Sequence, residues 1–83
     1  MTTTIQQLDA LILVAQENGY QIRYEYLGGA GGGLCEFGGR KWLFVDLALN
    51  AIETLEMVRT SLLSDPSIGV NPIDAVIALR SAA

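Results

Sequence analysis

The chain has 83 residues, which fits a single domain with a thin core, because domains typically run from about 50 to 250 residues. Apolar residues make up 51% of the sequence, the mean hydropathy is +0.36 and the net charge is −4. The five basic residues are scattered apart from one adjacent pair. This argues against nucleic-acid binding and against binding to an anionic membrane surface, since both need clustered positive charge.

The sequence contains one cysteine, Cys35, and no histidine. A single thiol forms no internal disulfide, and the first residues lack the basic start of a signal peptide. The longest apolar run, Ala10 to Ala15, is far shorter than the roughly 20 residues that span a bilayer. We therefore expect a cytoplasmic protein. Histidine is the usual general base at neutral pH and the commonest metal ligand, so we also expect no enzyme activity, no metal and no cofactor.

A first helix is predicted from about Ile5 to Asn18. Thr4 and Gln7 have the spacing of a capping box, and apolar residues recur at helical spacing up to Ala15. Asn18 followed by glycine is a typical helix stop.

Three strands are predicted next. Residues 20–27 alternate apolar and polar side chains, which indicates a half-buried strand from Tyr20 to Leu27. Two further strands, Leu34–Phe37 and Arg40–Leu47, flank Gly38-Gly39, a pair that suits a type I′ hairpin turn. Counting outward from this turn pairs Phe37 with Arg40, Glu36 with Lys41, Cys35 with Trp42 and Leu34 with Leu43.

A second helix is predicted from near Asn50, with Glu53 at the capping-box position, to about Leu63. Asn71-Pro72 indicates a third, short helix, since Asn caps helices and Pro favours their first position. The prediction is a single α+β domain over residues 1–83 with element order α-β-β-β-α-α. Its small antiparallel three-stranded sheet is expected to pack against the helices.

Six residues between the first two strands are all glycine except Ala30: Gly28, Gly29, Gly31, Gly32 and Gly33. A phosphate-binding loop needs a Lys and a Ser or Thr leading into a helix, whereas here a strand follows without them. We interpret the run as a flexible or bulged connection. The alternative is a loop that lets a ligand or a partner backbone approach closely.

Two polar side chains of the hairpin are candidates for chemistry. Asp46 either binds a cation together with Glu36 or Glu25, or ends its strand and accepts hydrogen bonds from backbone amides or an arginine. We favour the second interpretation, because a buried carboxylate must be paired. Cys35 is expected to act as a small buried apolar residue, with a redox or nucleophilic thiol as the alternative.

Aromatic residues stand at alternating strand positions: Tyr24, Tyr26, Trp42 and Phe44. These side chains could form a ligand-stacking platform, but the pattern is more typical of a core, and an oligomer interface is the next interpretation.

Two stretches carry a resemblance to a family of small uncharacterised bacterial proteins. They are Leu27-Gly28-Gly29 with Gly32-Gly33-Leu34-Cys35, and Leu43-Phe44-Val45-Asp46-Leu47. The family shares a helix, a Gly-Gly-Leu-Cys hairpin, a Phe-Val-Asp-Leu strand and a second helix. The resemblance covers Tyr24 to Leu63 and implies no activity.

A more distant similarity is to the ImmA/IrrE zinc metallopeptidases, whose helix after the hairpin carries His-Glu-x-x-His. The corresponding helix here, from Asn50, has no histidine, so the resemblance implies the scaffold alone.

The leading hypothesis is a non-enzymatic interaction or structural protein that forms a homo-oligomer, with a dimer expected. Its contact surface is predicted around Cys35, Trp42 and Phe44, because both faces of the sheet are apolar. A rival hypothesis is a small-ligand or metal-binding module that uses the glycine loop with Cys35, Arg40 and Asp46. A third is a redox role for the thiol. All three place the working surface between Gly28 and Asp46.

Overall fold

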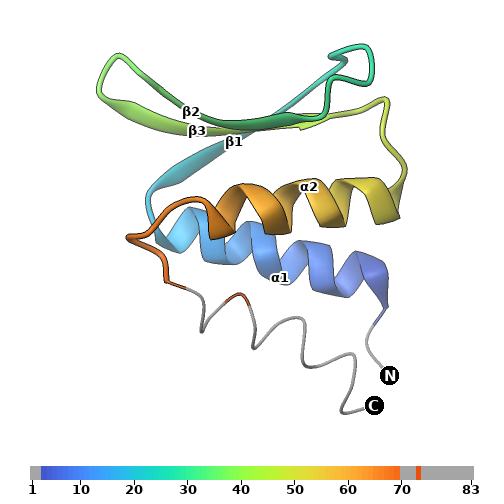
Figure 1. Ribbon diagram of the computed structural model, residues 1–83, viewed down its shortest axis with the longest axis horizontal. Coiled ribbons are helices and arrows are strands. Elements are labelled where there is room, and N and C mark those ends of the chain that lie inside the picture. Colours follow the sequence, from blue (N-terminus) through green and yellow to red (C-terminus); the bar gives the residue numbers. More distant parts are fainter. Residues whose placement is uncertain (1–2, 70–72, 74–83) are drawn as a thin grey trace.

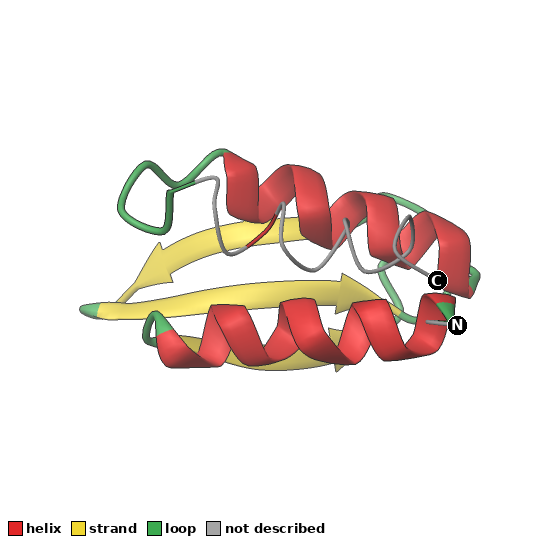
Figure 2. Cartoon of the chain, turned by 90° about the horizontal axis from the view of Figure 1, so that it is seen from below, coloured by secondary structure: helices red, strands yellow, loops and turns green. Residues whose placement is uncertain are grey.

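The computed structural model describes residues 3–69 and residue 73. Its elements, in order, are α1 (Thr4–Glu17), β1 (Tyr20–Glu25), β2 (Gly32–Phe37), β3 (Arg40–Asp46) and α2 (Ala51–Leu63). The sheet forms one layer and the two helices form a second layer on one of its faces (Figure 1). Seen from the helix side, α1 and α2 lie next to each other along the strands (Figure 2). In the described part of the chain, neither helix has the length and apolar character needed to cross a membrane.

Both helices begin with a capping box. In α2 it is formed by Asn50 and Glu53, as predicted. In α1 the box lies one residue earlier than predicted, because Thr3 and Gln6, rather than Thr4 and Gln7, exchange the side-chain bonds. Consecutive threonines offered the same hydroxyl at either position, so the spacing alone did not choose between them.

The sheet is mixed, with strand order β1-β3-β2. β2 and β3 are antiparallel, and the four pairings counted from the Gly38-Gly39 turn are confirmed. The prediction of a wholly antiparallel sheet is wrong, because β1 runs parallel to β3. The chain from β1 passes over the end of β3 to the far edge, a distance of two strand spacings, or about 10 Å. The hairpin then returns β3 into the gap beside β1.

Strand bounds also differ from the predicted ones. β1 ends at Glu25 instead of Leu27, and β2 begins at Gly32, two residues before Leu34. The glycine run therefore supplies the first two residues of a strand as well as a connection. The predicted third helix at Asn71-Pro72 lies outside the described residues, which contain two helices.

The core lies between the helices and one face of the sheet. Its fully buried members include Leu11 of α1, Leu43 of β3, and Val58 and Leu62 of α2. The prediction that the four strand aromatics form the core is wrong. Tyr24 and Tyr26 are 54% and 78% exposed, and Trp42 and Phe44 are half-buried outside the core cluster. Trp42 and Phe44 lie on the sheet face that no described helix covers, whereas Tyr24 shares the helix-side face of its partner Val45 but stands next to the last residue of β1.

Gly32 is the glycine that the sheet depends on most. Its φ is +87°, and a Cβ at this position would collide with the carbonyl group of Phe44 on β3. Gly28 also has a positive φ, +68°, but a Cβ there would meet open space.

We predict that Gly32→Ala lowers the free energy of unfolding by about 3 kcal/mol, since it adds a backbone clash to the left-handed strain. The matched control Gly28→Ala should cost only about 1 kcal/mol, from the strain alone. Urea unfolding followed by Trp42 fluorescence measures both. Equal losses would show that β2 moves away to accept a side chain.

Candidate functional site

Asp46 organises the glycine loop. Its side chain is 1% exposed and accepts four backbone hydrogen bonds. Oδ1 accepts from the N–H groups of Leu27 (3.0 Å) and Ala48 (2.9 Å), and Oδ2 accepts from those of Gly29 (2.8 Å) and Gly31 (3.1 Å). The interpretation of Asp46 as a strand-ending carboxylate bonded to backbone amides is confirmed.

The same bonds explain the electrostatics of this carboxyl group. The N–H of Leu27, followed by those of Ala48, Gly31 and Gly29, holds the pKa of Asp46 below its usual value, although burial acts in the opposite direction. Successive amides of this kind form a concave anion site. Here the anion is the protein's own side chain: three N–H groups of the β1–β2 connection and the N–H of Ala48 are donated to Asp46 rather than to a phosphate.

Two residues of the predicted ligand-binding set lie far apart. Arg40 and Asp46 occupy opposite ends of β3, roughly 20 Å apart at about 3.3 Å per residue. Cys35 lies between these ends, opposite Trp42. It is exposed, so the expectation of a buried apolar cysteine is wrong. The structure does not bring Cys35, Arg40 and Asp46 into one pocket.

The structure does bring Cys35, Trp42 and Phe44 together on one surface. Trp42 and Phe44 stand two residues apart on β3, with ring centroids 6.4 Å apart and planes tilted by 34°. Strand alternation places them opposite to the buried Leu43 and Val45, on the sheet face that points away from α1 and α2. We call this surface the outer face.

A shallow groove lies beside Phe44. Its volume is about 280 Å³, and it is lined by Leu27, Gly32, Gly33, Leu34, Cys35 and Phe44. Gly33, which lines this groove, is the partner of Phe44 across the strands. The aromatic pair is therefore bordered by an apolar hollow.

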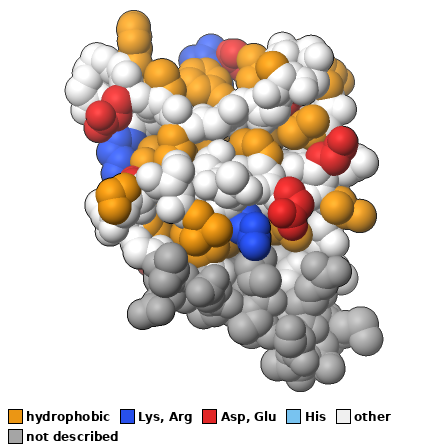
Figure 3. All heavy atoms as spheres, viewed as in Figure 1, with side chains coloured by type: hydrophobic (Ala, Val, Ile, Leu, Met, Phe, Trp, Pro, Cys, Tyr) orange, Lys and Arg blue, Asp and Glu red, His pale blue; other side chains and the backbone are white. Residues whose placement is uncertain are grey.

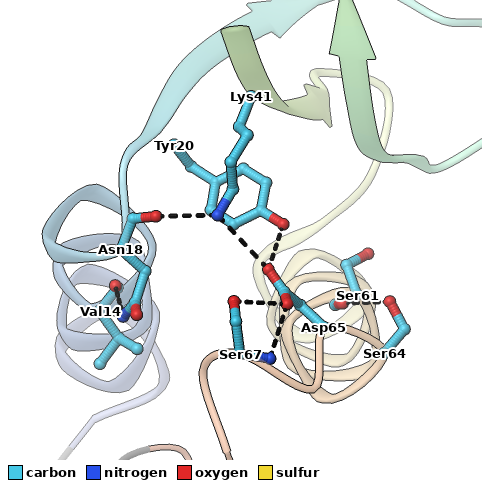
Figure 4. Close-up of polar contacts among 8 residues, drawn as sticks. All are labelled: Val14, Asn18, Tyr20, Lys41, Ser61, Ser64, Asp65 and Ser67. Atoms are coloured by element: carbon cyan, nitrogen blue, oxygen red, sulfur yellow. Dashed lines mark hydrogen bonds and ion pairs between the residues drawn. The ribbon is translucent and has the colours of Figure 1, made fainter. Parts of the chain in front are cut away.

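A second candidate site, missed in the sequence, lies on the helix side of the sheet (Figure 4). Tyr20 Oη donates a hydrogen bond of 2.5 Å to Asp65 Oδ2. Lys41 Nζ donates to the carbonyl of Asn18 (3.0 Å), lies 3.6 Å from Asp65 Oδ2 and stands 4.3 Å from the centre of the Tyr20 ring. These contacts join the starts of β1 and β3 to the segment after α2.

Serines complete this cluster. The N–H and hydroxyl of Ser67 donate to Asp65 Oδ1 (2.9 and 2.7 Å), and the hydroxyl of Ser64 donates to the carbonyl of Ser61 (2.6 Å). A pocket of about 400 Å³ opens here, which we call the polar pocket. It is lined by Tyr20, Leu34, Cys35, Glu36, Lys41, Ser64, Asp65, Pro66 and Ser67.

Titration of the polar pocket follows from these contacts. Burial and the bond to Asp65 raise the pKa of Tyr20 to about 12. The Tyr20 hydroxyl, with the two donors of Ser67, lowers the pKa of Asp65 to about 2. Each partner thus favours the protonation state that the other needs: a neutral phenol and an ionised carboxylate.

In comparisons with known proteins, no protein-family model, curated protein or solved structure matches this chain. The resemblances to the bacterial Gly-Gly-Leu-Cys family and to the ImmA/IrrE scaffold therefore stay predictions.

Asp46→Ala should destabilise the fold strongly, because it leaves four backbone donors without their acceptor. We expect the midpoint of thermal unfolding to fall by roughly 10 °C or more. Asp46→Asn keeps one acceptor oxygen and should lie between Ala and the parent. The control Asp9→Ala, at an exposed position of α1, should change little. Added acetate should partly restore Asp46→Ala but not Gly32→Ala; no difference between the two would contradict the amide site.

Stability should depend on pH through Tyr20 and Asp65. Since the pKa of Tyr20 is raised from 10.0 to about 12, its contribution is complete below pH 10 and is lost as the pH rises toward 12. Since the pKa of Asp65 is lowered from 3.8 to about 2, its contribution is present above pH 3.8 and is lost as the pH falls toward 2.

Thermal midpoints of the parent and of Tyr20→Phe, measured across pH, test this assignment. The variant should be less stable near neutral pH and should lose less stability at both extremes. The parent-minus-variant absorbance at 295 nm should show phenolate forming near pH 12. A difference spectrum with its midpoint at pH 10 would contradict the Tyr20–Asp65 bond.

Proposed function

We propose that the protein is a non-enzymatic interaction module that forms a homodimer through the outer face of its sheet. The observation that carries the proposal is the Trp42–Phe44 pair, half-exposed on a face that no described helix covers. Large apolar side chains gathered on one sheet face mark an interaction surface more often than isolated ones do. Aromatic side chains are also enriched in protein interfaces.

The outer face is complementary to itself. Phe37, which is 76% exposed, shares the face of Cys35 and lies two residues beyond it on β2. Gly33 and the groove lie two residues before Cys35. A two-fold axis that crosses the strands at the Cys35–Trp42 row therefore places Phe37 of each copy over the groove of the other. Such an isologous contact closes into a dimer.

The same axis places other groups favourably. Arg40 and Phe44 lie equally far from Trp42 along β3, so the Arg40 of one copy faces the Phe44 ring of the other, as in a cation–π contact. Arg23 and Glu25 form an ion pair of 2.8 Å on the same face. Among the described residues, the helices carry four other carboxylates of this acidic chain: Asp9, Glu17, Glu53 and Glu56. The outer face can thus meet a second copy without concentrated negative charge.

The size of the face sets the strength of the dimer. Three strands spaced by about 4.8 Å, each about 20 Å long, present roughly 300 Å² in projection. A standard interface buries about 800 Å² per partner. We therefore expect a dimer that dissociates on dilution.

Sedimentation velocity over a range of concentrations tests the dimer. Phe37→Glu should raise the dissociation constant at least about tenfold, because it places a charge in the apolar groove of the second copy. The control Leu13→Glu makes the same change at a side chain of α1 that is 55% exposed. Apolar side chains also reach the surface singly (Figure 3), so this control separates the outer face from general stickiness. A parent that stays monomeric at millimolar concentration, or equal effects of both variants, would refute the proposal.

Cys35 provides a second measurement, since it lies on the proposed axis and is the chain's single thiol. A short bismaleimide should link two copies of the parent efficiently and two copies of Phe37→Glu poorly. The control double variant Cys35→Ser with Leu13→Cys moves the thiol to the helix side and should cross-link poorly.

A further inference from the structure

The hydroxyl groups of the polar pocket direct their protons inward. The hydroxyls of Tyr20 and Ser67 donate to Asp65, and that of Ser64 donates to the carbonyl of Ser61. Each hydroxyl has a single proton, so each oxygen retains lone pairs and can only accept a further bond. The hydroxyl oxygens of the pocket are therefore hydrogen-bond acceptors toward a ligand.

The charges of the pocket also favour a ligand that donates hydrogen bonds and carries a positive charge. Glu36 and Asp65 contribute two carboxylates against the one ammonium group of Lys41. Lys41 is already occupied by the Asn18 carbonyl, the Asp65 carboxylate and the Tyr20 ring. The C-terminal end of α2, which ends in Leu63, adds the negative end of the helix dipole next to Ser64.

Glu36 is the carboxylate available to a ligand. It is exposed, and its partner across the strands is Lys41, which is itself the partner of Tyr20. Opposite residues of neighbouring strands share a face, so Glu36 stands at the rim of the pocket on the same side as the Tyr20 hydroxyl. Its charge acts on Tyr20 and helps to raise the pKa of the phenol.

From this arrangement we propose that the polar pocket binds a small organic cation with several N–H donors, a guanidinium or primary ammonium group, whose charge is paired with Glu36. The N–H groups donate to the outward lone pairs of Tyr20, Ser64 and Ser67. Leu34 and Pro66 line the pocket beside the short alkyl part of such a molecule. The volume, about 400 Å³, is within the range of small-molecule sites.

Two other ligand classes fit the pocket less well. An anion would need Lys41, whose ammonium group is held by three contacts inside the protein. A divalent metal ion would need carboxylate oxygens, and both oxygens of Asp65 already accept from Tyr20, Lys41 or Ser67. Inorganic phosphate and Mg²⁺ therefore serve as competing probes.

The test is a titration of the ¹⁵N-labelled protein with methylguanidinium and, separately, with butylammonium, followed by amide chemical shifts. Saturable shifts should appear at Ser64 and Ser67. Glu36→Gln should weaken binding at least about tenfold. The matched control Glu56→Gln removes the same charge from an exposed position of α2 and should bind within twofold of the parent.

Several results would overturn the proposal. They are phosphate or Mg²⁺ producing the same saturable shifts at lower concentration, equal affinities of Glu36→Gln and Glu56→Gln, and no shift with either cation. Glu36 is exposed, so its replacement by Gln should leave the fold intact. Unchanged amide chemical shifts away from the pocket verify this. Binding is measured on the monomer at low concentration, so its outcome is independent of the dimer.

Discussion

The fold depends on the capture of the Asp46 carboxylate by the backbone of the glycine loop. After β1 the chain must cross the end of β3 to reach the far edge of the sheet. A crossing loop exposes backbone N–H groups beside a buried strand end, and each one left unpaired is costly. Asp46 stands at that end and accepts from three of them, those of Leu27, Gly29 and Gly31, and also from the N–H of Ala48 just after β3. The mixed sheet is therefore possible because a single side chain completes the hydrogen bonds of its connection.

Alternation along β3 then separates two candidate surfaces. Lys41 points to the helix side and enters the polar pocket, while Trp42, the next residue, points to the outer face. Leu43 returns to the core and Phe44 to the outer face. Because the described helices cover only one face of the central strand β3, this strand contributes side chains to the core, to the polar pocket near its start and to the aromatic surface of the outer face. The two surfaces share a backbone but no side chain apart from Leu34 and Cys35, which border both hollows.

Local patterns predicted the local structure well. The glycine turn fixed the register of the hairpin, and Asn50 with Glu53 fixed the start of α2. The sheet order could not be predicted in this way, because strands that follow each other in the chain usually pair, whereas here β3 separates β1 from β2. The sequence predicted that Asp46 accepts hydrogen bonds from backbone amides or an arginine, since a buried carboxylate needs donors. Which amides they would be depended on where the loop crosses.

The polar pocket was beyond prediction for a related reason. Tyr20 and Asp65 are 45 residues apart. Tyr20 was predicted as the first residue of a strand, and no local pattern links it to Asp65. The cross-strand pair of Glu36 and Lys41 was predicted, yet Lys41 turns to Asp65 instead. The pocket contains two carboxylates, Glu36 and Asp65, and one ammonium group, that of Lys41. These groups sum to one negative charge, which Glu36 carries. This extra negative charge arises only because the fold brings the end of α2 next to the starts of β1 and β3. The pocket's preference for a cation is therefore a property of the fold and not of any one segment.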